Sequence, residues 1–71
     1  MEYDYSRLKG KMVEFYETNT AFAKAMGMGR VSLYRKLHNQ SEWTQDEMER
    51  AMTLLKIPRS SIRAYFFTHK V

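Results

Sequence analysis

The sequence contains no cysteine, a single proline and only three glycines, and it has no long run of apolar residues. The lack of cysteine excludes disulfide bridges, thiolate zinc sites and a cysteine nucleophile. No apolar stretch approaches the roughly 18 residues of a membrane-spanning helix, and the start of the chain carries the acidic residues Glu2 and Asp4, unlike the basic start of a signal peptide. We therefore expect a soluble protein of the cytoplasm that has no membrane partner.

Strand-forming residues are also scarce. Three Val and two Ile stand against six Met, five Leu and five Ala. Met, Leu and Ala favour helices, whereas Val and Ile favour strands, and the few glycines and prolines leave little material for hairpin turns. A chain of 71 residues is long enough for one small domain, and 44% apolar residues is too many for a disordered tail. We predict a single all-α domain over residues 1–71.

Apolar residues at helical spacing predict three helices in the first half of the chain. Thr18 is placed to cap the second of them, which runs to Met26, and Gly27 tolerates the left-handed conformation that ends a helix. Gly29 then precedes a third helix over residues 30–38. The first helix carries one stripe that we expect to be buried: Tyr5, Leu8, Met12, Phe15 and Tyr16.

Two more helices are predicted in the second half. Thr44 and Glu47 have the spacing of a capping box, which opens a fourth helix with an apolar face from Met48 to Leu55. Pro58 breaks this helix and suits the first turn of a short last one. Residues 67–71 trail out beyond it. The expected architecture is a compact domain of five helices without internal repeats.

The net charge of +4 is unevenly distributed along the chain. No acidic residue occurs between Glu17 and Glu42, and each of the four charged residues in that window is basic. A segment without negative charge, flanked by acidic ones, predicts a face for an anionic or polar partner. The alternative is a basic face that is merely solvated.

The same window, residues 18–39, has the residue types of a helix-turn-helix. Ala23 is small where the two helices cross, Gly27 permits a sharp reversal, and Leu33 anchors the second helix so that its other face turns outward. Together with Leu37, Trp43-Thr44-Gln45-Asp46-Glu47, Ile57-Pro58 and Tyr65-Phe66-Phe67, these residues resemble lambda-repressor-like regulators of the Cro and repressor type. The ending is similar to small phage regulators of Gram-positive hosts.

The resemblance implies that the second helix of the motif enters the major groove of operator DNA, with the protein acting as a weak dimer in the bacterial host. Its outward, base-facing set is Arg30, Val31, Ser32, Tyr34 and Arg35. The expected phosphate contacts are Asn19, Lys24, Lys36, His38, Asn39 and Gln40, with the backbone amides at Thr44 as a further anion site.

A second partner stays open at this point. The chain has no basic arm before the first helix, and Val31 and Tyr34 replace the polar residues common in the base-facing set. Tyr and Arg are enriched in the binding hot spots of protein interfaces. Some phage regulators of this type are antirepressors: they modulate repression by binding a repressor and blocking its DNA-binding surface. The resemblance thus also implies a phage repressor protein as the partner.

No residue pattern indicates an enzyme or a cofactor. His38 and His69 are far apart and have no partner at metal-ligand spacing, so we expect no metal site. The carboxylates of residues 42–49 belong to a capping box and a solvated helix face rather than to a catalytic pair.

Two aromatic features remain. Trp43 is expected to be a packing anchor. Three aromatic residues in a row near the C-terminus cannot all face inward on a helix, so at least one is expected to be exposed and to mediate dimerisation or partner binding. These candidates for a dimer or partner surface are Tyr65, Phe66 and Phe67.

Overall fold

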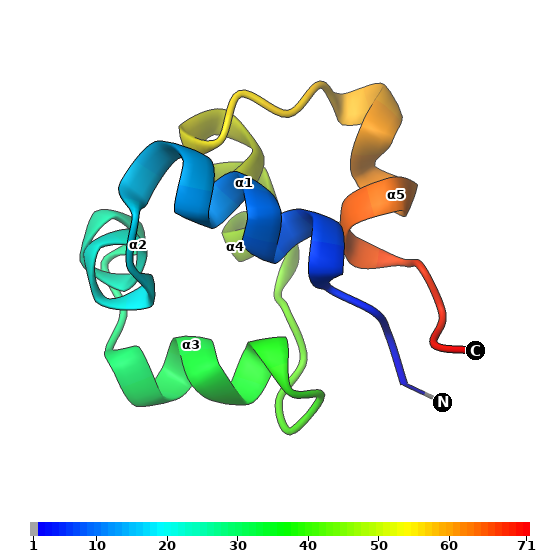
Figure 1. Ribbon diagram of the computed structural model, residues 1–71, viewed down its shortest axis with the longest axis horizontal. Coiled ribbons are helices and arrows are strands. Elements are labelled where there is room, and N and C mark those ends of the chain that lie inside the picture. The colour runs from blue at the N-terminus through cyan, green and yellow to red at the C-terminus, as the bar shows by residue number, and fades with distance from the viewer. Residues whose placement is uncertain (1) are drawn as a thin grey trace.

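The computed structural model describes residues 2–71 and contains five α-helices and one short 3-10 helix (Figure 1). This confirms the predicted all-α architecture of five helices. Within residues 2–71 the only strand-like pairing is an isolated antiparallel bridge between Tyr3 and His69. In chain order the elements are α1 (Ser6–Tyr16), α2 (Asn19–Met26), α3 (Arg30–Leu37), α4 (Gln45–Leu54), η1 (Arg59–Ser61) and α5 (Ile62–Phe66).

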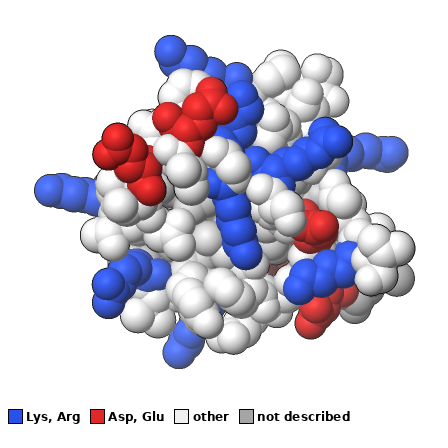
Figure 2. All heavy atoms as spheres, in the orientation of Figure 1, with Lys and Arg blue, Asp and Glu red and all other residues white. Residues whose placement is uncertain are grey.

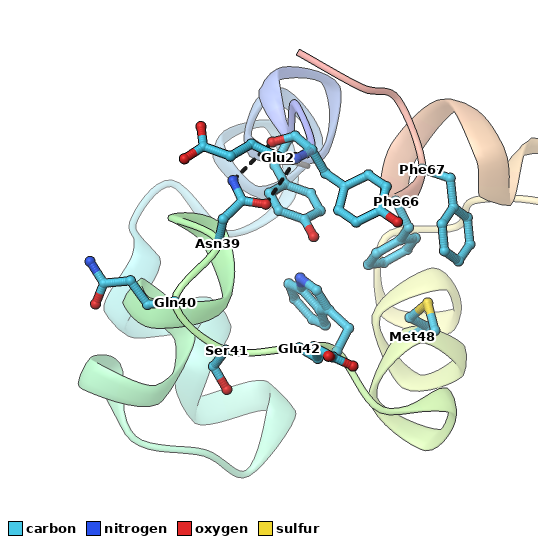
Figure 3. Close-up of a pocket in the computed structure, with 11 residues that line it drawn as sticks. Glu2, Asn39, Gln40, Ser41, Glu42, Met48, Phe66 and Phe67 are labelled. Atoms are coloured by element: carbon cyan, nitrogen blue, oxygen red, sulfur yellow. Dashed lines mark hydrogen bonds between the residues drawn. The ribbon is translucent and has the colours of Figure 1, made fainter.

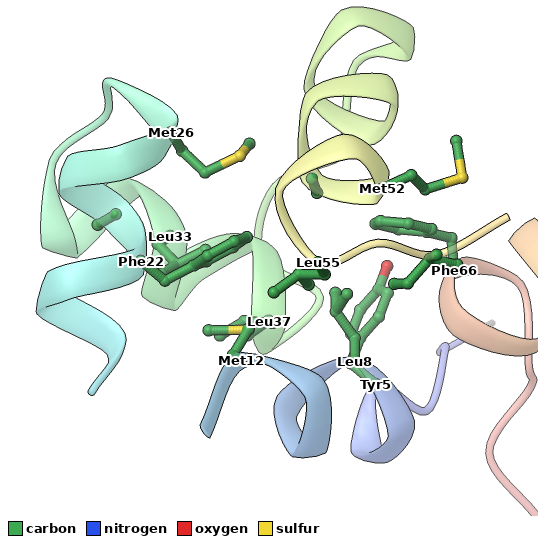
Figure 4. Close-up of a cluster of buried hydrophobic side chains, with 13 residues drawn as sticks. Tyr5, Leu8, Met12, Phe22, Met26, Leu33, Leu37, Met52, Leu55 and Phe66 are labelled. Carbon is green, nitrogen blue, oxygen red and sulfur yellow. The ribbon is translucent and has the colours of Figure 1, made fainter. Parts of the chain in front are cut away.

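One apolar core joins all five helices (Figure 4). Leu8, Phe22, Leu33 and Leu55 are completely buried, and burying a side chain of this size contributes about 1.5–3 kcal/mol. The predicted stripe of the first helix is correct at Tyr5, Leu8 and Met12, whereas Tyr16 is half-buried. The prediction is wrong at Phe15, which is 38% exposed because it lies beyond the edge of the buried face.

The turn between α2 and α3 has the local geometry that the sequence predicts. The Thr18 hydroxyl accepts a hydrogen bond from the Ala21 N–H at 3.1 Å and so caps α2. Gly27 ends that helix in the left-handed region at φ 76°, and Gly29 is the N-cap of α3. Ala23 is buried in the core, which lets α3 approach α2 closely. We call residues 18–38 the α2–turn–α3 unit.

The second half of the chain departs from the prediction at Pro58. The capping box of Thr44 and Glu47 is present and starts α4. Pro58, however, has an extended conformation and is the N-cap of η1, so it precedes the last helical segment instead of lying in its first turn. Three residues of η1 then lead into α5.

The terminal segments pair with each other, and the prediction that residues 67–71 trail out is wrong. The Asp4 N–H donates to the Thr68 carbonyl at 2.6 Å, and the Lys70 N–H donates to the Glu2 carbonyl at 3.0 Å. The two ends of the chain accordingly lie side by side in Figure 1. Backbone pairing between residues this far apart leaves no signal in local periodicity.

Candidate interaction surface

The outer face of α3 carries the base-facing set that the resemblance implied. Two of them are large apolar side chains, with Val31 62% and Tyr34 51% exposed. Leu33 and Leu37 on the opposite side are buried and fix the orientation of the helix against the core. The exposed set consists of Arg30, Val31, Ser32, Tyr34 and Arg35. Their exposure matches the prediction, and what they bind is a separate question.

A shallow hollow lies between the start of α2 and the first turns of α3. It has a volume of about 290 Å³ and is lined by Asn19, Arg30, Val31 and Tyr34. The Tyr34 ring stacks on His38 with 4.0 Å between ring centroids. His38 Nδ1 lies 2.8 Å from the Tyr34 carbonyl, which only accepts, so Nδ1 carries the proton. The stack holds the Tyr34 ring against the helix and leaves much of it open to solvent.

The exposed charges on the face formed by α2 and α3 are all positive. Lys24, Arg30 and Arg35 are its exposed charged side chains, and neither α2 nor α3 contains an acidic residue. Figure 2 shows Lys and Arg without Asp or Glu over the region of α3, at the lower left of that view. A surface of this kind attracts groups of negative charge and repels exposed cations that have no other counter-charge.

Lys36 is not a phosphate contact, because its side chain is turned into the protein. The residue is only 8% exposed, and its ammonium group donates to the Glu42 carbonyl and to Glu47 Oε1, both at 2.9 Å. Burial raises the pKa of the Glu47 carboxyl, but the Thr44 N–H and the Lys36 ammonium outweigh burial and hold this pKa below its ordinary value. Lys36 therefore joins α3 to the start of α4.

The predicted anion site at the start of α4 is wrong, because the Glu47 carboxylate already occupies it. Glu47 Oε1 accepts the Thr44 N–H at 2.9 Å, and the Glu47 N–H donates to Thr44 Oγ1 at 3.2 Å. A carboxylate already occupies the position that a phosphate would take at this helix start. The Thr44 amides are therefore not a site for DNA phosphate.

Asn39 is likewise a structural residue rather than a phosphate contact. Its Oδ1 accepts the Tyr3 N–H at 2.9 Å, and its Nδ2 donates to the Tyr3 carbonyl at 3.0 Å. The residue follows α3 and adopts φ 62°, a conformation that Asn tolerates better than most residues. Its amide thus ties the N-terminal segment to the end of α3. The other predicted phosphate contacts are exposed, namely Asn19, Lys24, His38 and Gln40.

The three consecutive aromatic residues near the C-terminus have different surroundings. Phe66 is only 2% exposed and packs edge-on against Trp43 with 5.1 Å between centroids, so its prediction as a dimer or partner surface is wrong. The contact agrees with the expectation that Trp43 is a packing anchor. Tyr65 is half-buried, and Phe67 is 42% exposed with its ring against Tyr3. The expectation that at least one of the three is exposed holds for Phe67.

Sequence reasoning missed a second side chain that holds the α2–turn–α3 unit in place. The Arg50 guanidinium in α4 donates through Nη1 to the Met26 carbonyl at 2.8 Å, which satisfies an acceptor at the end of α2. A Cβ at Gly27 would stand 3.6 Å from the same guanidinium. The one available signal was Arg50 as the single basic residue in the acidic segment 42–50.

Residues 2–71 contain no group of three His, Asp or Glu side chains placed to hold a metal ion. No helix among them has the length and apolar character that crossing a membrane requires.

The chain resembles both a defined protein family and a protein of known structure. A family described as proteins of unknown function, DUF739, matches residues 1–69. The solution structure of the modulator of repression (MOR) of the temperate bacteriophage TP901-1 from Lactococcus lactis matches with a TM-score of 0.85 at 39% sequence identity. The match covers 100% of this chain and 96% of that one. A comparison with functionally curated proteins gives no match. The chain therefore belongs to the DUF739 family, and it shares the fold of that phage modulator of repression.

Proposed function

We propose that this chain is a modulator of repression that binds the DNA-binding domain of a phage repressor through α3 and thereby blocks operator binding. The observation that carries the proposal is the full-length match, at 39% identity, to a protein whose name is modulator of repression. In this proposal the α2–turn–α3 unit is a helix-turn-helix that has a protein as its partner. It acts in the cytoplasm of the bacterial host and catalyses no reaction.

The chemistry of the α3 face supports a protein partner. Val31 and Tyr34 lie one helical turn apart and expose apolar surface that a monomer leaves in water. Arg30 and Arg35 flank them on the same helix. Aromatic residues and Arg surrounded by polar groups are the usual composition of an interface hot spot. Burying Tyr34 and Val31 supplies the affinity, and the arginines supply orientation.

Operator DNA is the weaker of the two candidates. The observation in its favour is the positive, acid-free face of α2 and α3. With Lys36 and Asn39 engaged inside the protein, that face offers three charged contacts, Lys24, Arg30 and Arg35. Specific DNA-binding proteins commonly neutralise about 6–10 phosphates. A monomer with this surface would bind DNA weakly.

Inhibition follows from competition for one surface. A repressor occupied on its recognition helix cannot also place that helix in the major groove. A competitor that binds the repressor and excludes DNA lowers the repressor's apparent affinity for the operator. The affinity falls by about the ratio of the competitor's concentration to its dissociation constant for the repressor, so a 100-fold ratio lowers it about 100-fold. An excess of modulator over repressor thus removes the repressor from the operator, although the modulator itself does not contact DNA.

The test is the release of labelled operator DNA from the repressor encoded by the same phage, followed by fluorescence anisotropy as this protein is added. Wild-type protein should displace the operator, and Tyr34→Ala should need about 30-fold more protein, as for a hot-spot residue. Arg7→Ala, an exposed cation on α1, is the matched control and should act as wild type. A direct shift of operator DNA by this protein alone, weakened by Arg30→Ala, would instead establish the operator-binding function.

A further inference from the structure

A larger cavity lies beyond the C-terminal end of α3, outside the hollow described above. It has a volume of about 650 Å³ and lies between the N-terminal segment, the loop that follows α3, and α5 (Figure 3). Aromatic rings form much of its wall, from Tyr3, Tyr5, Trp43, Phe66 and Phe67. We call it the aromatic pocket. Its lining includes residues 39–43, which follow the C-terminal end of α3, so the pocket lies next to that end of the helix.

The charge of the aromatic pocket is opposite to that of the α3 face. Two carboxylates, Glu2 and Glu42, line the pocket, whereas no Lys or Arg does. Glu2 is paired with Lys70 at 3.3 Å where both side chains are exposed. Glu42 forms no ion pair within residues 2–71, since Lys36 contacts its carbonyl oxygen and not its carboxylate. The pocket therefore contains one carboxylate, Glu42, that has no ion-pair partner within residues 2–71, and it lies next to the positive face formed by α2 and α3.

The walls of the pocket are held in place before any partner arrives. Asn39 fixes the backbone of Tyr3 with two hydrogen bonds. Trp43 rests edge-on against Phe66, and its ring centroid lies 6.3 Å from that of Tyr5. The indole N–H of Trp43 is buried and has no acceptor within residues 2–71. A preformed pocket reduces the ordering cost of binding.

We propose that the aromatic pocket receives an arginine side chain of the partner repressor, an inference that rests on the function proposed above. Aromatic ring faces carry negative potential and attract cations. A planar guanidinium stacks on rings and bonds a carboxylate such as Glu42 at the same time, which an ammonium group does less well. The volume of the pocket admits the arginine together with part of the chain that carries it.

This assignment resolves an electrostatic conflict in the proposed complex. The surface that a repressor uses for DNA is rich in Lys and Arg, because it neutralises phosphates. The face formed by α2 and α3 on this protein is positive as well and offers those cations no counter-charge. Of the two cavities adjoining α3, the one with carboxylates is the aromatic pocket, and the other contains Arg30. The aromatic pocket thus offers a cation on the repressor a favourable place next to α3.

The first experiment needs no repressor. Labelled protein is titrated with N-acetylarginine methylamide and, separately, with N-acetylcitrulline methylamide, which has nearly the same shape and no charge. We expect saturable shifts of the Trp43 indole signal with the arginine compound and none with citrulline. Glu42→Gln should weaken arginine binding severalfold, whereas Glu14→Gln, on the exposed side of α1, should not. Equal shifts with both compounds, or no shift with either, would overturn the assignment.

The second experiment uses the repressor and separates the two proposals. Isothermal titration with wild-type protein tests whether the complex forms at all, and failure there overturns the proposed function and the repressor as the source of the arginine. If the complex forms, Glu42→Gln should weaken it about five- to tenfold, while Glu14→Gln leaves it unchanged. A complex that is as tight with Glu42→Gln as with wild type would overturn the pocket assignment alone.

Discussion

Replacing Lys36 with Met should destabilise the protein at neutral pH, and the loss should shrink in acid. Met retains most of the apolar stem of Lys36 and removes the ammonium group, so packing against the core changes little. The ammonium group donates two hydrogen bonds of 2.9 Å, one to the Glu42 carbonyl and one to Glu47. Both disappear in the variant, and the connection between α3 and α4 disappears with them.

The magnitude follows from these contacts. Hydrogen bonds to charged groups contribute about 1.5–3 kcal/mol each, but solvent screens the Glu47 side chain, which is 26% exposed. Removing a nearly buried ammonium also relieves its desolvation. We expect a net loss of about 1–2 kcal/mol from a total stability of about 4–10 kcal/mol for a domain of this size. With a urea m-value near 1 kcal/mol per molar, the midpoint should fall by about 1–2 M.

The pH dependence has a definite sign. The pKa of Glu47 is lower in the folded protein than its ordinary value, so its contribution is complete above the unfolded pKa and is lost as the pH falls through the folded pKa. In Lys36→Met this pKa rises toward its ordinary value, because the cation is gone. The difference in stability between variant and wild type should therefore be largest near pH 7 and smaller near pH 3.

Urea unfolding followed by the fluorescence of Trp43, the single tryptophan, measures the loss of stability in Lys36→Met and its dependence on pH. Lys24→Met, an exposed lysine on α2, is the control and should stay within about 0.5 kcal/mol of wild type. Equal losses at pH 7 and pH 3 would refute the ion pair with Glu47 as the cause. No loss at pH 7 would refute the structural role of Lys36 altogether.

Three further predictions concern the remaining structural devices. Gly27→Ala should lower stability by about 1–2 kcal/mol, because the residue stands at φ 76°, whereas Gly10→Ala in the open middle of α1 should raise it by about 0.5–1 kcal/mol; thermal unfolding measures both. Asn39→Ala should free Tyr3 and lower stability by about 1–2 kcal/mol, and the amides of the paired terminal segments should then exchange hydrogen faster. Phe66→Ala should cost about 3–5 kcal/mol in urea unfolding, since the ring is buried in the core.

Local signals in the sequence were enough to predict the helices. Thr18, Gly27 and Thr44 mark helix ends through hydrogen bonds and backbone conformations that involve residues within one turn. The spacing of Leu33 and Leu37 determines which side of α3 faces the core, and hence which side is exposed. For these reasons the all-α fold and the outward side of α3 could be predicted from the residues, whereas the base-facing set on α3 was implied by the resemblance to lambda-repressor-like regulators.

The errors at Lys36, Asn39 and the chain ends arose where contacts join separate elements of the fold. Asn39 bonds to Tyr3, 36 residues away, and Lys36 turns inward because an acidic cap lies at the start of another helix. A basic or amide side chain at the end of an exposed helix has the same sequence signature whether it faces solvent or contacts another residue inside the protein. The aromatic pocket was missed for the same reason, because its walls come from both ends of the chain and from the loop after α3.

The most direct test of the central claim is chemical-shift mapping of this protein, isotopically labelled, with the DNA-binding domain of the repressor from the same phage. We predict that the largest changes fall on the outer face of α3, at Val31, Tyr34 and Arg35, and on the start of α2 at Asn19. The exposed side of α1 around Val13 should remain unchanged. Changes confined to α1, or no change with the repressor alongside clear changes on α3 with operator DNA, would contradict the claim.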